Sequence, residues 1–450
     1  MAKSHRDLTT GPVWRLTALL ALPSTLENVM FAASSIINTY WMGRVPGMAI
    51  AAVTLGTTLR LALISPMMGL SAGGMAVVAR HLGAKEQAQA DKAVMQTLLL
   101  VVLFVVPLGL IGLAFGGVFL RWMGASGALH ADALSYLRII LSGLLFMEML
   151  PTMSGVMRAA GHPEYTLRIN AVFVVVMTIL EAALVLGWGP FAAMGVRAAG
   201  WASVIASATA VAVQMTILVR GGAGVKLHWH DMRPDRRTMW RVLRIALPST
   251  LQRFSPNMAN AVMLRIVGGL GPTVLTGYSV VQTIFGTLQA PSMGVSSAVT
   301  AMVGQNLGAK APDRSERSAR VGLLLGAGAA VVLMGTVNLV PARAIGLFDS
   351  RPDIVAAGIP LLRMMLVVST TYAWTMVMNG ALCGAGDTVT PMIISLVSMW
   401  LVQIPASWLL GHATGLGPIG VWIGLAVGYT VNAFVVQLQF RRGRWKTIRV

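Results

Sequence analysis

Hydrophobic residues in this chain come in long runs with short polar connections between them, not in the alternating pattern of soluble strands. A run of about 20 apolar residues crosses about 30 Å of hydrocarbon as a helix. Backbone groups find no water inside lipid and the runs are too long for barrel strands, so the pattern predicts helices. Twelve spans are predicted, at 14–42, 47–75, 93–116, 134–157, 165–187, 193–219, 241–268, 272–300, 317–340, 358–382, 390–411 and 417–439.

The twelve spans consist of one six-span pattern written twice, with an offset of 225 residues in a chain of 450. Ala21–Leu26 returns at 246–251, and Leu82–Lys85 returns at 307–310. An even number of spans in each copy gives both copies the same orientation, and such parallel repeats enclose a cavity in alternating-access transporters. The alternative is that duplication only enlarges a helical bundle. We predict an all-α membrane protein of two parallel six-helix repeats.

Composition and charge agree with a membrane protein. The chain is 56% hydrophobic and 11% charged, and its mean hydropathy is +0.73, which leaves too little polar surface for a soluble protein. Most of the 34 Lys and Arg residues lie at the termini and in alternate connections, so these segments and both termini are predicted to face the cytoplasm, across the inner (plasma) membrane. The same rule and anionic lipid explain the net charge of +19, without nucleic acid as a partner.

The charge pattern also divides the chain. We predict an N-terminal six-helix lobe at 1–219, a basic cytoplasmic linker at 220–240 and a C-terminal six-helix lobe at 241–450. The first apolar run contains Glu27 and matches the start of the second copy, so it is not interpreted as a cleaved signal.

Motifs for chemistry are lacking in the sequence. The single cysteine, Cys383, excludes an internal disulfide and makes a cysteine metal site improbable. No metalloprotease motif, phosphate-binding loop or nucleophile motif occurs, and His228 and His230 lie in the basic linker, where solvation is their expected role. A membrane-embedded enzyme is therefore the weaker alternative. Without an ATP-binding motif, active transport would use an ion gradient, and neither an organic cofactor nor a metal is expected.

Three acids lie within the predicted spans, all in the first copy: Glu27, Glu148 and Glu181. The 225-residue offset places Gln252, Ala373 and Ala406 at the corresponding positions. A carboxylate in hydrocarbon costs several kcal/mol unless it is hydrated, paired or protonated, so each acid indicates a function. The alternative is that Glu27 or Glu148 only forms a hydrogen bond, in protonated form, to a neighbouring helix.

Helical spacing groups the polar residues further. Glu27, Ser34 and Asn38 are 7 and 11 residues apart, which places them on one face of their helix. The span 165–187 carries a similar stripe, made of Asn170, Thr178 and Glu181. The two stripes could face each other.

Buried cations form a second set that also breaks the repeat: Arg60, Arg253 and Arg265. Arg265 lies near a span end, where its side chain could reach the interface. Arg60 and Arg253 lie deeper, and together with Glu148 they are candidate residues of a substrate cavity. They could pair with Glu27 or Glu148, or line the cavity and favour an anionic group on a substrate. The sequence leaves both readings open.

Three segments carry a family resemblance. The first is a proline in the first helix, Pro23, with Asn28 five residues on and the segment Asn38–Arg44; the others are Leu82–Lys85 with its repeat and the segment Gly380–Thr388. Together with the length and duplication, the chain resembles the multidrug and toxic compound extrusion (MATE) family over nearly all its length. The resemblance implies a V-shaped pair of six-helix lobes that exports cationic or amphipathic compounds in exchange for H⁺ or Na⁺.

The resemblance is closest to the branch similar to DinF proteins, in which the coupling-ion site lies in the first lobe. The usual acid of the fifth helix corresponds to Glu181, and a threonine of the sixth helix corresponds to Ser203. Two positions depart from the pattern, because the acid of the first helix is Asn38 and an asparagine of the fifth is Met177. The acids typical of NorM-like relatives are missing, with Pro256 and Tyr372 near those positions.

These departures favour a proton, which needs one titratable group, over Na⁺, which needs several oxygen ligands. We predict H⁺ coupling through Glu181, with Glu27 as a substitute for the missing acid and Asn38, Asn170 and Ser203 as polar neighbours. The expected partners are small amphipathic cations, H⁺ and membrane lipid, and the protein is expected to be a monomer. Two alternatives remain: a flippase for a lipid-linked anionic molecule, and a sensor or scaffold that transports nothing.

Overall fold

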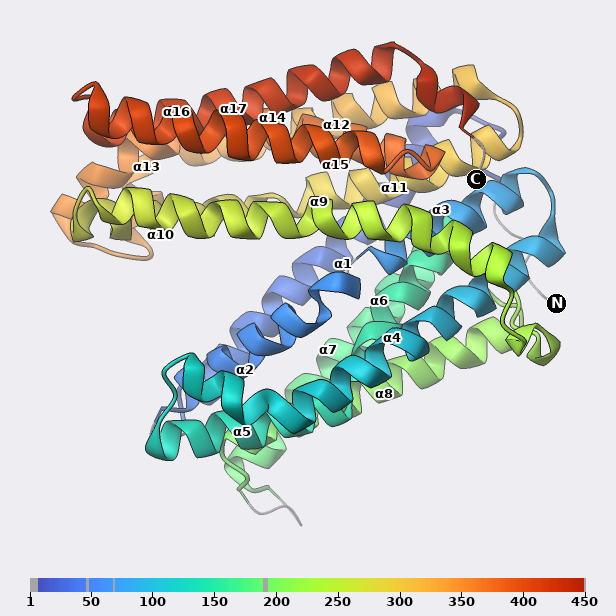
Figure 1. Ribbon diagram of the computed structural model, residues 1–450, viewed down its shortest axis with the longest axis horizontal. Coiled ribbons are helices and arrows are strands. Elements are labelled where there is room, and N and C mark those ends of the chain that lie inside the picture. The colour runs from blue at the N-terminus through green and yellow to red at the C-terminus, as the bar shows by residue number, and fades with distance from the viewer. Residues whose placement is uncertain (1–6, 46–47, 68, 189–192, 449–450) are drawn as a thin grey trace. The chain divides into compact units, whose positions relative to one another are not determined.

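The computed structural model describes residues 7–45, 48–67, 69–188 and 193–448, although the side chains of Pro66, Trp229, Arg253 and Phe254 lie outside the description. The described chain folds into long helices joined by short turns (Figure 1). Helices satisfy their backbone hydrogen bonds within one segment, which is what a lipid environment requires.

In its described residues the first half contains eight α-helices, of which two pairs are the halves of broken spans. Their bounds are α1 (Val13–Met42), α2 (Ala49–Ile64), α3 (Leu70–Gly83), α4 (Gln87–Trp122), α5 (Gly127–Ser142), α6 (Leu144–Ala159), α7 (Pro163–Leu186) and α8 (Val196–Val219).

The second half repeats this order with fewer breaks. Its helices are α9 (Arg236–Gly268), α10 (Pro272–Leu288), α11 (Ala290–Gly308), α12 (Pro312–Leu339), the short α13 (Pro341–Gly346), α14 (Pro352–Ala385), α15 (Val389–Leu396), α16 (Ile404–Trp408) and α17 (Gly417–Arg441). The segments Val397–Gln403 and Leu409–Ala413 continue the α15–α16 helix with π-helical turns.

In the described residues, eight helices are long and apolar enough to cross a membrane, and the α5–α6 pair, bent by 52°, makes a ninth. The other three predicted spans correspond to α9 and to the pairs α2–α3 and α10–α11. The twelve-span prediction is therefore confirmed, but the spans 47–75, 134–157 and 272–300 are broken where the sequence pattern predicted one helix each. At the α5–α6 break the close approach of helices requires Gly143, because an added Cβ would lie 2.4 Å from a Val204 methyl group.

The repeat extends to unusual backbone conformations. Lys85 and Lys310 both adopt positive φ, at 62° and 58°, which is uncommon for residues other than glycine. Gly161 and Gly386, also 225 residues apart, have φ of 82° and 88°. The two copies therefore share turn geometry as well as sequence.

The described chain forms two compact units, each with its own core. The first contains Glu27–Leu82 and Glu86–Thr250, and the second contains Asp7–Leu26, Gly83–Lys85 and Leu251 onward. The helices α1 and α9 are each divided between the two units, α1 after Leu26 and α9 after Thr250. In the first unit α8 packs against α5, α6 and α7, and in the second α14 packs against α10, α11, α12 and α17.

The segment after α8 folds back onto the start of α4 in the first unit. Lys226 donates its backbone N–H to Asp91 Oδ1 at 2.9 Å. Gln96, fully buried, donates to the backbone carbonyls of Asp231 and Arg233 and accepts from the N–H of Asp235. The basic segment between the halves is therefore tied to α4 by buried polar side chains.

Candidate functional site

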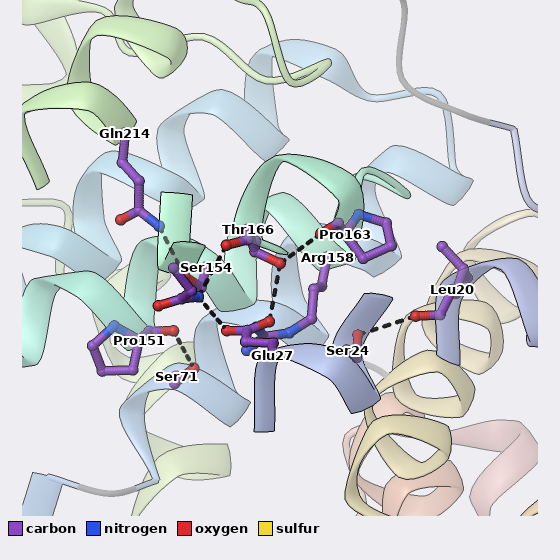
Figure 2. A network of polar contacts seen from close by, with 11 residues as sticks. Leu20, Ser24, Glu27, Ser71, Pro151, Ser154, Arg158, Pro163, Thr166 and Gln214 are labelled. Carbon is purple, nitrogen blue, oxygen red and sulfur yellow. Dashed lines mark hydrogen bonds and ion pairs between the residues drawn. The ribbon is translucent and has the colours of Figure 1, made fainter. Parts of the chain in front are cut away.

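Glu27 lies on α1 with its side chain almost fully buried, 8% exposed. Arg158, at the end of α6, donates from Nη1 to both carboxylate oxygens of Glu27 at 3.0 Å (Figure 2). Two residues of α7 complete the site: Thr166 donates from Oγ1 to Oε2 at 3.0 Å, and Asn170 donates from Nδ2 to Oε1 at 2.8 Å. The carboxyl group of Glu27 thus joins three helices.

The bonding around Glu27 is that of an ionised carboxylate. It accepts four hydrogen bonds, and one of its three partners is a cation. A charged pair with both oxygens occupied offsets much of the cost of burying the charge. The alternative in which Glu27 is a protonated packing residue does not agree with this geometry.

Glu181 lies on α7 in a different environment, with a fully buried side chain. Asn38 of α1 donates from Nδ2 to Oε1, and Oε2 has no hydrogen-bond partner in the described part of the chain. No salt bridge to Glu181 occurs among the described residues. An ionised carboxylate with one neutral donor is poorly compensated in such a site.

The two acids belong to one arrangement along α1 and α7. Glu27 pairs with Asn170 and Asn38 pairs with Glu181, so both pairs have the same separation of 143 residues. The ring centroids of Phe31 and Phe173 lie 6.0 Å apart between the two pairs. The Glu27–Asn170 pair and the Asn38–Glu181 pair are eleven helical residues apart, which is about 16 Å along the helix axis. The two polar stripes do face each other, with one acid on each helix and at opposite ends of the shared face.

The third buried acid is also paired. Arg60 Nη1 of α2 lies 3.2 Å from Glu148 Oε1 of α6, and the two side chains are 17% and 15% exposed. Of the two partners that the sequence left open for Arg60, the structure selects Glu148. The side chain of Arg253 lies outside the described residues, so its predicted place in a substrate cavity stays a prediction.

Ser203 lies on α8 and is nearly buried, at 9% exposed. Its carbonyl oxygen accepts a hydrogen bond from Ser207 Oγ, and no hydrogen bond joins it to Glu181 in the residues that the structure describes. The remaining predicted neighbours, Asn38 and Asn170, each contact an acid.

Sequence reasoning missed Arg158 and Thr166. Arg158 lies one residue beyond the predicted span 134–157, and so was not counted among the buried cations. The 225-residue offset places Cys383 opposite Arg158 and Pro391 opposite Thr166. The same break in the repeat that marked Glu27 could have marked both residues.

The described residues contain no group of three or more His, Cys, Asp or Glu side chains suited to hold a metal ion. The buried polar groups described in the first unit include carboxylates, amides and arginines. Such groups can bind and release a proton or pair with a charged ligand.

Comparison with known proteins identifies the family. The MatE family model matches residues 23–183 and 248–409, one match in each half. The chain is 25% identical over 432 residues to the probable multidrug resistance protein YoeA of Bacillus subtilis (strain 168), covering 94% of this chain and 92% of that protein. It is 27% identical over 434 residues to the probable multidrug resistance protein NorM of Rhodopseudomonas palustris, with coverages of 95% and 91%.

Solved structures show the same fold. An outward-facing multidrug resistance MATE family transporter of the MOP superfamily matches with a TM-score of 0.91 and 21% identity, covering 99% of this chain and all of that chain. A MOP superfamily transporter from Pyrococcus furiosus matches with a TM-score of 0.90 at the same identity and coverage. From the two family matches, the duplicated fold and the full-length relatives, this multi-pass membrane protein belongs to the MATE family of multidrug transporters.

Proposed function

We propose that this protein is an H⁺-coupled efflux antiporter in which Glu181 binds the coupling proton. The observation that carries the proposal is the environment of Glu181, which is fully buried and, among the described residues, receives a hydrogen bond from one neutral side chain. Ala406 occupies the corresponding position in the second half, so the acid is not a requirement of the fold. A buried acid of this kind in a membrane protein favours proton transfer as its role.

A proton suits this site better than Na⁺. Asn38 directs its amide nitrogen, not its oxygen, toward Glu181. Met177, one turn before Glu181 and 4% exposed, supplies no oxygen ligand. A sodium ion needs several oxygen ligands, whereas a proton needs only the carboxyl group.

The coupling step follows from the charge on Glu181. In the ionised state the hydrogen bond from Asn38 is charge-assisted, and protonation weakens it while removing a buried charge. Protonation therefore alters how the end of α1 is held against α7, and this biases the conformational equilibrium. A difference of one pKa unit between two conformations is worth about 1.4 kcal/mol, or roughly a tenfold bias.

Glu27 is better suited to anchoring α1 than to carrying a second proton. Its carboxylate is fully occupied by Arg158, Thr166 and Asn170. Protonation would place a hydrogen against one of these donors. We therefore assign the mobile proton to Glu181 and a fixed charge pair to Glu27.

The further assignments follow the resemblance. We place the protein in the branch similar to DinF proteins, in the plasma membrane, with both termini cytoplasmic and the monomer as the working unit. Its substrates would be cationic or amphipathic small molecules. The flippase alternative needs cations in the cavity, and Arg60 does not favour it because Glu148 neutralises its charge.

The experiment is dye export from proteoliposomes driven by a pH gradient or a Na⁺ gradient, with wild type, Glu181→Gln and Glu181→Asp. We expect pH-driven flux in wild type, its loss in Glu181→Gln and partial retention in Glu181→Asp. Glu164→Gln is the matched control, because Glu164 lies in the first turn of the same helix and its side chain is 32% exposed. Unchanged pH-driven flux in Glu181→Gln, or flux driven by Na⁺ alone, would refute the proposal.

A further inference from the structure

An open groove with a volume of about 480 Å³ lies on the surface of the first unit between α4 and the start of α9. Leu100, Leu103 and Phe104 of α4 form one wall. Arg236, Arg237 and Trp240 of α9 lie on the other. The groove therefore combines an apolar wall on α4 with two cations at the start of α9.

The apolar part of the groove is exposed. Leu103 is 59% exposed, Phe104 is 38% exposed and Trp240 is 62% exposed. All three are large apolar side chains. In a protein that crosses a membrane, such side chains on an outer surface face lipid chains.

The described residues leave the positive charge at the groove without an ion-pair partner. No ion pair to the side chains of Arg236 or Arg237 occurs among the described residues. The nearest acid in the sequence, Asp235, is occupied by Lys92, whose Nζ lies 2.7 Å from Asp235 Oδ2. Two adjacent guanidinium groups are therefore available to an anion, and guanidinium matches the geometry of phosphate.

The sequence places this groove at a membrane interface. Leu100, Leu103 and Phe104 fall within the predicted span 93–116, whereas Arg236 and Arg237 precede the predicted span that begins at 241. Trp240 lies between the two levels, where tryptophan is enriched in membrane proteins. Apolar side chains at the level of the lipid chains, with arginines at the level of the headgroups, complement one phospholipid molecule.

We infer that this groove binds an anionic phospholipid, with its phosphate on Arg236 and Arg237 and an acyl chain along Leu103 and Phe104. The bound lipid would bridge α4 and α9 at the point where the basic segment is tied to α4 through Gln96. It would thereby hold the start of α9 in the first unit. The inference does not depend on which ion drives transport.

The experiment measures lipid binding to the purified full-length protein by native mass spectrometry. The probes are phosphatidylglycerol and phosphatidylcholine with the same acyl chains. We expect wild type to prefer phosphatidylglycerol, and the double variant Arg236→Gln/Arg237→Gln to bind it about 30-fold more weakly, since each arginine is worth roughly 1 kcal/mol at a membrane surface. Binding of phosphatidylcholine should not change.

The matched control is Arg441→Gln/Arg442→Gln, which removes two adjacent exposed arginines at the end of α17. It has the same change in net charge and should bind phosphatidylglycerol as wild type does. Leu103→Trp, which fills the apolar wall, should weaken binding of both lipids. Equal losses in the two double variants, equal wild-type affinity for the two lipids, or displacement of the lipid by inorganic phosphate would each overturn the inference.

Discussion

Removing Arg158 should destabilise the first unit strongly, because it leaves the carboxylate of Glu27 buried without its counter-charge. Arg158 supplies two of the four hydrogen bonds that Glu27 accepts, and it is the one cation among the three partners. Thr166 and Asn170 remain in Arg158→Met, but both are neutral donors. The prediction concerns the free energy of unfolding and not transport.

The magnitude follows from burial. Glu27 and Arg158 have side chains that are 8% and 17% exposed, and breaking a buried pair by removing one partner costs about 3–5 kcal/mol. For a unit of 150–250 residues this corresponds to a fall in melting temperature of about 6–20 °C. Replacing both partners removes the uncompensated charge, so Glu27→Gln/Arg158→Met should recover at least about 2 kcal/mol relative to Arg158→Met.

The assay is thermal unfolding in detergent of the purified wild type, the single variants Glu27→Gln and Arg158→Met, and the double variant that combines them. Arg320→Met is the control, because Arg320 forms an i,i+4 pair with Glu316 while its own side chain is 73% exposed. Loss of that pair should cost less than about 1 kcal/mol. If Arg158→Met unfolds at the same temperature as Arg320→Met, or if the double variant is no more stable than Arg158→Met, the reasoning about the buried pair is wrong.

Two further predictions concern packing and acid stability. Gly384→Ala should cost about 1–3 kcal/mol, because its Cβ would lie 2.3 Å from the Thr300 carbonyl oxygen. Gly328→Ala, with no atom within 4 Å of the added Cβ, should stabilise its helix by up to about 1 kcal/mol; equal melting temperatures would contradict this. The hydrogen bond from Lys92 lowers the pKa of Asp235 from 3.8 to about 2, so a contribution of about 1 kcal/mol is complete above pH 4 and disappears as the pH falls toward 2. Asp235→Asn should therefore be less stable than wild type at pH 6 and equally stable near pH 2, as thermal unfolding at the two pH values would test.

Several site features were within reach of the sequence, because they depend on position along single helices. The 11-residue spacings of Glu27 with Asn38 and of Asn170 with Glu181 predicted two polar stripes, and the structure brings them together in pairs. Spacing could not show which acid would receive a cation. That depends on how α6 packs in the unit, which brings Arg158 to Glu27, whereas Glu181 receives only Asn38 among the residues that the structure describes.

The hydrophobic pattern could not predict the breaks within spans, because they too depend on contacts between helices. Apolar residues continue through 47–75, 134–157 and 272–300, so hydrophobicity alone reads each as one helix. The break at Gly143 accompanies a close approach to Val204 of α8, which is a contact between segments distant in the chain.

The sequence by itself determined the membrane environment, the duplication and the chemical difference between the halves. Each of these depends on the composition of one segment or on the comparison of two segments. Only the tertiary structure decided that Glu27 is paired with a cation, that Glu181 has no cationic partner within the described part of the chain, and that Arg60 pairs with Glu148. Burial and pairing depend on which helix faces are brought together, and this is set by the packing of the whole unit rather than by any one helix.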